Sequence, residues 1–128
     1  MMKNFYLEKT SKTPKISLDG ITGKFIISGR SIPENSLEFY KPVYDWLDEY
    51  KSEPQDTTFV EVSLEYFNTS SSKCIVEILR RVESLTEVGS RVIVKWYYDE
   101  EDEDMKEAGL DFQEIIKIPI ELEMIEEE

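Results

Sequence analysis

The chain of 128 residues contains no histidine and only one cysteine, Cys74. Histidine is the commonest general base and the commonest transition-metal ligand, so its absence excludes Ser-His-Asp, Cys-His and histidine-zinc mechanisms. One cysteine cannot form an internal disulfide or build a thiolate metal site alone, which agrees with a reducing compartment. We therefore predict that Cys74 is a core residue and that the protein is cytoplasmic.

Long hydrophobic runs are also missing, since none approaches the roughly 20 residues that a bilayer crossing needs. No segment resembles a signal peptide. Hydrophobic residues make up 40% of the chain and aromatic residues 12%, which is enough for one compact core. We expect a single domain over residues 1–128, with no membrane segment, no cofactor and a frayed acidic tail at 126–128.

Basic residues are scarce, because 15 lysines and arginines face 28 aspartates and glutamates and leave a formal net charge of −13. Such a surface repels nucleic acid and anionic membranes. The composition therefore predicts a protein partner or a cationic surface as the binding partner, and no nucleic-acid partner.

Hydrophobic periodicity and turn residues divide the chain into alternating strands and helices. Strands are predicted near 5–8, 15–18 and 23–28, over 58–67 and 91–98, and at a sheet edge within 117–128. Helices are predicted over about 36–50 and 71–85, with two short ones near 103–108 and 111–116. Pro42 predicts a kink or a later start of the first helix, and Gly109 predicts the end of the third.

This order of elements predicts an α/β fold with a mixed sheet. The first three strands suit an antiparallel meander, and the strand–helix–strand repeats after them imply right-handed crossovers between parallel strands. In the strand at 91–98, apolar residues alternate with the polar Arg91 and Lys95. We therefore expect the helices to cover mainly one face of the sheet.

The candidate functional site is the stretch "YFNTSSSK" at 66–73, which joins a strand to a helix. Its side chains can cap the helix by accepting hydrogen bonds from free N–H groups. Alternatively, one hydroxyl is displayed for phosphorylation, since a helix start stabilises a phosphate. Spacing does not choose among Thr69 and Ser70 to Ser72. Asn68 and Lys73 are candidate supporting residues, although an exposed pair with Lys73 would contribute only about 0.2 to 0.5 kcal/mol.

Two other groups of side chains suggest chemistry less specifically. The acidic run Asp99 to Asp104 has oxygen ligands for Mg²⁺ or Ca²⁺ but lacks the spacing of an EF-hand loop, which favours a solvated loop. Glu61 and Glu65 are better explained as the exposed face of a strand than as a catalytic acid and base. The aromatic residues are expected to be core residues or to form a docking patch; they are Phe39, Tyr40, Tyr44, Trp46, Tyr50, Trp96, Tyr97 and Tyr98.

Several segments, in the same order along the chain, resemble the SiaC family of regulatory phosphoproteins. The segments are "TSKTP" (10–14), "GRSIPEN" (29–35), "FYKPVYDWL" (39–47), "LEYFNTSSSK" (64–73) and "KWYYDEEDEDMKEAGLDF" (95–112). The most specific pieces are the PEN motif at 33–35, the NTSS motif at 68–71 and the tryptophan-tyrosine-acidic run. One departure is Ile32, where the family would have an aromatic residue.

The resemblance implies a fold like that of anti-sigma-factor antagonists, the STAS domains, and a function without catalysis. It implies phosphorylation by a serine/threonine kinase and dephosphorylation by a PP2C-type phosphatase. It also implies that the unphosphorylated form binds and activates a diguanylate cyclase, in c-di-GMP and biofilm control. The family's phosphorylated threonine corresponds to Thr69, with Asn68, Ser70, Ser71 and Lys73 as supporting or interface residues. The alternative is a constitutive acidic scaffold in which "NTSSS" only caps a helix.

Overall fold

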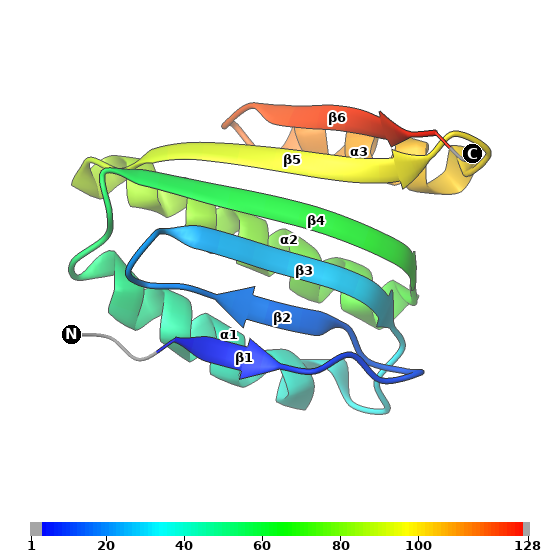
Figure 1. Ribbon diagram of the computed structural model, residues 1–128, viewed down its shortest axis with the longest axis horizontal. Coiled ribbons are helices and arrows are strands. Elements are labelled where there is room, and N and C mark those ends of the chain that lie inside the picture. Colours follow the sequence, from blue (N-terminus) through cyan, green and yellow to red (C-terminus); the bar gives the residue numbers. More distant parts are fainter. Residues whose placement is uncertain (1–3, 127–128) are drawn as a thin grey trace.

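A computed structural model describes residues 4–126, which form one six-stranded sheet and three α-helices (Figure 1). The frayed tail predicted at 126–128 lies largely outside these residues. The elements in chain order are β1 (Phe5–Leu7), β2 (Lys15–Leu18), β3 (Lys24–Ser31), α1 (Ser36–Lys51), β4 (Thr57–Phe67), α2 (Thr69–Glu83), the 3-10 helix η1 (Ser84–Val88), β5 (Arg91–Asp99), α3 (Glu103–Ile115) and β6 (Ile120–Ile125).

The strands lie in the sheet in the same order as in the sequence. β1, β2 and β3 pair antiparallel, as the predicted meander requires, and β3 to β6 pair parallel. Each parallel connection contains one α-helix, and the connection from β4 to β5 also contains η1. β3 and β4 are parallel, so their carboxyl-terminal ends lie at the same end of the sheet. α1 and α2 both begin there.

The three helices lie behind the sheet in Figure 1, and the buried residues show the same arrangement. Along β4, Thr58, Val60, Val62 and Leu64 are buried, whereas the residues between them are partly exposed. This period of two places one face of the strand against the helices. The mixed sheet with helices mainly on one face is therefore as predicted, and Cys74 is a buried core residue.

The structure contradicts the later helix start predicted at Pro42 and the helix end predicted at Gly109. α1 begins at Ser36 and continues through Pro42, while the alternative of a kink there stays a prediction. The N–H that proline lacks would have bonded the carbonyl of Glu38, and both residues are exposed, so water can satisfy that carbonyl. The two short helices predicted around Gly109 are one helix, α3, in which Gly109 is a buried interior residue.

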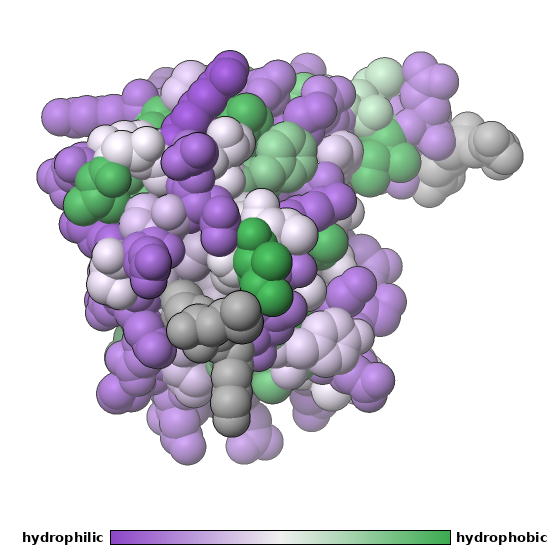
Figure 2. All heavy atoms as spheres, turned by 60° about the vertical axis from the view of Figure 1, so that its left-hand side comes forward, coloured by the Kyte–Doolittle hydropathy of each residue, from purple (hydrophilic) through white to green (hydrophobic). Residues whose placement is uncertain are grey.

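One face of the molecule is mainly polar. Figure 2 shows hydrophilic side chains over most of one face, with hydrophobic ones in small separate patches. In the part of the chain that the structure describes, no helix has the length and hydrophobicity that a bilayer crossing requires.

Candidate functional site

The first turn of α2 is capped by Asn68. Its side-chain oxygen accepts a hydrogen bond from the backbone N–H of Ser71 at 2.9 Å, and its backbone is extended, as an N-cap requires. The backbone N–H of Asn68 donates to the carbonyl of Ser31 at 3.0 Å, which fixes the helix start to the end of β3. The capping interpretation therefore applies to Asn68 and not to Thr69.

A chain of hydroxyl groups connects the two helix starts below the surface. Ser71 is fully buried, and its Oγ accepts a hydrogen bond from Ser31 Oγ at 2.8 Å. Ser31 Oγ in turn lies 2.6 Å from Tyr40 Oη. Ser36 Oγ lies 2.7 Å from Ser70 Oγ and 3.4 Å from Ser71 Oγ. Such connected buried hydroxyls hold the first turns of α1 and α2 in one arrangement.

The start of α1 is built like the start of α2. Asn35 caps it by accepting from the backbone N–H of Glu38 at 3.1 Å, and Ser36 is its first residue. Each helix start presents a partial positive charge of about half a unit. Because Ser36 and Ser70 join the two first turns, these partial charges lie side by side and favour an anion.

A groove of about 840 Å³ runs from these helix starts along α1 and α2. Thr69, Ser70 and Lys73 line it on α2, and Leu37 and Tyr44 line it on α1. Thr69 is exposed, and within residues 4–126 its hydroxyl takes part in no side-chain hydrogen bond. Lys73 is exposed and forms no ion pair within the same residues. A free hydroxyl and a free ammonium group therefore share the groove.

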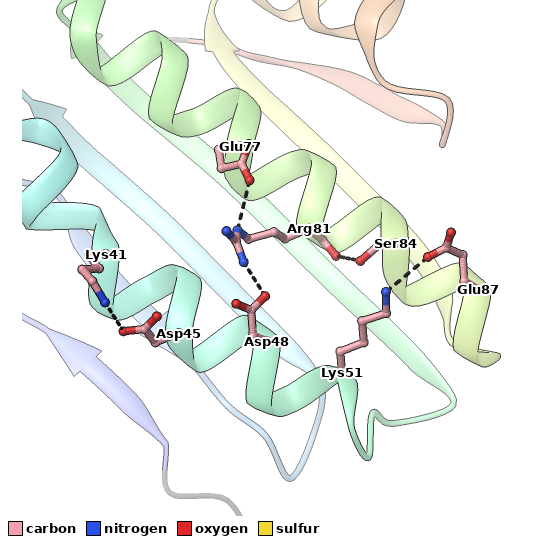
Figure 3. A network of polar contacts seen from close by, with 8 residues as sticks. All are labelled: Lys41, Asp45, Asp48, Lys51, Glu77, Arg81, Ser84 and Glu87. Carbon is pink, nitrogen blue, oxygen red and sulfur yellow. Dashed lines mark hydrogen bonds and ion pairs between the residues drawn. The ribbon is translucent and has the colours of Figure 1, made fainter.

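The other end of the groove is closed by Arg81, which bridges the two helices (Figure 3). Its guanidinium group pairs with Asp48 on α1 and, at 3.2 Å, with Glu77 on α2. It also lies 4.8 Å from the ring centre of Tyr44. Desolvation is the largest single effect and lowers the pKa of Arg81, but Asp48, Glu77 and Tyr44 together outweigh it, so the pKa is raised. Arg81 therefore stays charged and holds this end of the groove together.

Two tyrosines beside the groove hold their protons tightly. Burial raises the pKa of Tyr40 to about 12, although its hydrogen bond with Ser31 acts in the opposite direction. Burial also raises the pKa of Tyr44, as does the adjacent side chain of Cys74. The Tyr44 hydroxyl donates a hydrogen bond to the carbonyl of Cys74 at 3.3 Å. Both groups remain neutral at physiological pH.

We expect alkaline pH to destabilise the fold through Tyr40. An unfolded tyrosine loses its proton near pH 10, whereas the folded side chain keeps it until about pH 12. Raising the pH through this window, from about 10 to about 12, therefore favours the unfolded state. Below about pH 10 the contribution of Tyr40 to the free energy of unfolding is constant. Urea denaturation of wild type and Tyr40→Phe at neutral pH and within the window checks this. The variant should lose less stability over the window; equal losses would contradict the assignment to Tyr40.

The structure brings together most of the predicted site residues but gives them different roles. Thr69, Ser70 and Lys73 line the groove, Asn68 caps the helix, and Ser71 is buried, so Ser71 supports the site and cannot be a contact residue. Tyr44, which was predicted to be a core or docking-patch residue, lines the groove, whereas sequence reasoning missed Ser36 and Arg81. The asparagine that ends the PEN motif and the one that begins the NTSS motif were a usable signal, since Asn35 and Asn68 are both N-caps. Nothing local in the sequence indicated Arg81.

The other candidates have structural roles. Asp102 caps α3 by accepting from the N–H of Met105, and Asp99 accepts from the N–H of Glu101. Within residues 4–126 no group of three or more potential metal ligands is assembled. Glu61 forms an ion pair with Lys24 at 3.8 Å on the open face of the sheet. Of the predicted aromatic residues, Tyr40, Trp46, Tyr50 and Trp96 belong to the core.

Fold and site together define a small α/β domain on a six-stranded mixed sheet, with two helix starts joined at one groove. The model of the family described as "SiaC family regulatory phosphoprotein" matches residues 7–125. The chain belongs to the SiaC family.

Similar proteins match nearly the full length of this chain in sequence and in structure. An uncharacterized protein of Pseudomonas aeruginosa (strain UCBPP-PA14) is 31% identical over 126 residues, which cover 98% of this chain and all of the relative. The crystal structure of apo-SiaC from Pseudomonas aeruginosa has a TM-score of 0.87 at 30% identity, and the match covers 95% of this chain and 99% of that one.

A second crystal structure contains the diguanylate cyclase SiaD in complex with its activator SiaC, also from Pseudomonas aeruginosa. That SiaC matches with a TM-score of 0.87 at 30% identity, over 94% of this chain and 99% of that one. The matching structures are SiaC structures, so the resemblance to STAS domains stays a prediction.

Proposed function

We propose that this protein is a non-catalytic partner switch. Its unphosphorylated form binds and activates a diguanylate cyclase in the cytoplasm. A serine/threonine kinase phosphorylates Thr69 and releases the cyclase, and a PP2C-type phosphatase restores the binding form. The switch then follows the logic of anti-sigma-factor antagonists, with c-di-GMP synthesis and biofilm control as the output.

The observation that carries this proposal is the position of Thr69. It is the first residue of α2, it is exposed, and within residues 4–126 its hydroxyl has no side-chain hydrogen-bond partner. Its neighbour Ser70 bonds Ser36 and Asn68, and Ser71 is buried. A kinase can therefore reach Thr69 without breaking a bond of the folded domain, whereas modification of Ser71 would require local unfolding.

The electrostatics of α2 also favour a phosphate. The first turns of α1 and α3 already carry Glu38, and Glu103 with Asp104, respectively. The first turn of α2 has no acidic residue, although the chain has a net charge of −13. A phosphate on Thr69 would meet free N–H groups and the helix dipole, with Lys73 on the same groove.

A diguanylate cyclase is the proposed effector because a SiaC 30% identical to this chain forms a complex with one. The groove beside Thr69 has apolar side chains at its rim, including Leu37, which is 73% exposed. An exposed leucine in a groove of this size suits a protein contact. Adding about −1.5 to −2 charges at its mouth would oppose docking there.

The proposal predicts that the kinase transfers one phosphate to Thr69. Wild-type protein, Thr69→Ala and Ser70→Ala are incubated with the cognate kinase and ATP, and intact mass is measured. Wild type and Ser70→Ala should each gain one phosphate, and Thr69→Ala none. A PP2C-type phosphatase should then remove the phosphate from both modified proteins.

Wild-type phosphate gain by Thr69→Ala would reject the site. The absence of phosphate on all three proteins would leave the constitutive scaffold as the better description. Circular dichroism of each variant shows whether the fold is intact, and Thr69→Ala is expected to remain folded because Asn68, and not Thr69, caps α2.

A further inference from the structure

A second groove lies on the other side of the α2 start, between the end of β4 and α3. It consists of two adjoining hollows of about 540 and 480 Å³, which share Glu65 and Asp102. The first hollow includes Ser72 of α2 and the aromatic residues Tyr66, Phe67 and Phe112. The second includes Tyr97 and Tyr98 of β5. We call both hollows together the acidic groove.

The acidic groove carries one sign of charge. The first hollow is lined by Glu65, Asp102, Asp104, Glu107 and Asp111, and the second adds Asp99 and Glu101. No lysine or arginine is among the residues lining either hollow. Because only acidic charges line this concave surface, the negative electrostatic potential is concentrated inside the groove.

Five of the seven carboxylates are unpaired. Within residues 4–126, Glu65, Glu101, Asp104, Glu107 and Asp111 form no ion pair and no side-chain hydrogen bond. By contrast, several acids of α1, α2 and η1 are ion-paired, as Figure 3 shows for Asp45 with Lys41 and for Glu87 of η1 with Lys51. The groove therefore lacks the counter-charges that the domain supplies on its other helices.

The walls of the acidic groove are rigid. Phe112 packs edge-on against Trp96 with ring centres 5.1 Å apart, and Phe67 stacks with Phe112 at 6.3 Å. The indole N–H of Trp96 donates to the carbonyl of Met105 at 3.0 Å, which ties α3 to the sheet. Preorganised walls reduce the entropy lost when a partner binds.

The aromatic rim suits a guanidinium group in particular. The ring of Tyr66 is 51% exposed, and Arg30 of the neighbouring strand lies 6.0 Å from its centre. The domain itself thus shows a guanidinium group over this ring. Arginine combines attraction to carboxylates with stacking on aromatic faces, which lysine does less well.

We propose that the acidic groove is a docking site for an arginine-rich segment of a protein partner, separate from the groove beside Thr69. Charge complementarity selects the segment, because seven acids and no basic residue line a concave surface, with Arg30 beside its rim at Tyr66. The proposal does not depend on the phosphorylation of Thr69.

The test uses the full unphosphorylated chain and a synthetic peptide that alternates arginine and leucine. A second peptide replaces each arginine by citrulline, which keeps the shape and removes the charge. Calorimetry measures affinity, and amide chemical shifts locate the peptide. The arginine peptide should bind, with shifts concentrated around Tyr66, Ala108 and Asp111, and the citrulline peptide should not.

A matched pair of variants separates the groove from the overall charge. Glu65→Gln, Glu107→Gln and Asp111→Asn together should weaken binding about tenfold, as expected for three partly exposed ion pairs. The control, Glu49→Gln, Glu53→Gln and Asp56→Asn, removes the same charge; its two glutamates line a hollow at the end of α1 that contains no aromatic residue. The control should retain most of the affinity.

Equal weakening of both triple variants would show general attraction to an acidic protein and overturn the proposal. Equal binding of the citrulline peptide would also overturn it, because recognition would then be apolar. Titration with Mg²⁺ and Ca²⁺ gives a third outcome. If these ions shift the same amides and the arginine peptide does not, the groove is a cation site and not a docking site.

Discussion

Replacing Thr69 by glutamate is expected to weaken binding to the effector cyclase by about tenfold or more, while Thr69→Ala keeps nearly wild-type affinity. Thr69 lies at the mouth of the groove between α1 and α2, beside the exposed Leu37. A carboxylate there would have to be desolvated or excluded when an apolar partner surface docks. Tenfold corresponds to about 1.4 kcal/mol. A phosphate, with up to twice the charge, should weaken binding further.

The fold itself should not suffer from this substitution, which makes the binding result interpretable. A negative side chain in the first turn of a helix is favourable by about 0.3 to 1 kcal/mol, and this turn has no acid of its own. Thermal unfolding of Thr69→Glu should therefore occur at or slightly above the wild-type temperature. Lower affinity with an intact fold would then come from the charge at the interface.

Calorimetry against the cognate cyclase measures the effect, and SiaD of Pseudomonas aeruginosa is a suitable first effector because a SiaC 30% identical to this chain binds it. Ser84→Glu is a control, because Ser84 lies beyond the far end of α2, outside the groove. Equal affinities of Thr69→Glu and Thr69→Ala would remove the charge-based mechanism and favour a constitutive scaffold.

Much of the fold could be predicted from the sequence, because periodicity reports which residues are buried. The alternation in 58–67 and the helical stripe in 71–85 correspond to β4 and to α2 with η1. The errors occur at Pro42 and Gly109, where residue propensity and tertiary environment disagree. Pro42 lies on an exposed stretch of α1 that tolerates a missing hydrogen bond, and Gly109 is kept inside α3 by a neighbour far away in sequence.

The candidate site could be predicted only in part. The strand-to-helix junction was visible in the sequence, and the family resemblance assigned Thr69. Burial distinguishes the roles of the four hydroxyl residues, which their spacing in the sequence cannot do. Ser71 bonds Ser31 in the interior, and Ser31 bonds Tyr40, whereas Thr69 lines the groove. The second half of the site comes from α1, and only the parallel pairing of β3 with β4 places its start beside α2.

Gly109→Ala is expected to destabilise the protein by about 2 kcal/mol, although alanine is the better helix former. In an open helix position the substitution would stabilise by up to about 1 kcal/mol. Here a Cβ on Gly109 would lie 2.6 Å from Cδ1 and 2.9 Å from Nε1 of Trp96. Trp96 is fully buried and held by its bond to Met105, so it cannot move aside cheaply. Overpacking of this kind typically costs about 1 to 3 kcal/mol, which outweighs the gain in propensity.

A double-mutant cycle with Trp96→Phe identifies the cause. The smaller ring leaves room for a methyl group, so Gly109→Ala should cost clearly less in the Trp96→Phe background, with a coupling of about 1 kcal/mol or more. Stability is measured by urea denaturation, and an unchanged m-value would show that the comparison is between equally compact states. A stabilising Gly109→Ala in the wild-type background would mean that α3 does not pack on Trp96 as closely as described. In that case the walls of the acidic groove would be looser too, since Phe67, Trp96 and Phe112 form one aromatic cluster.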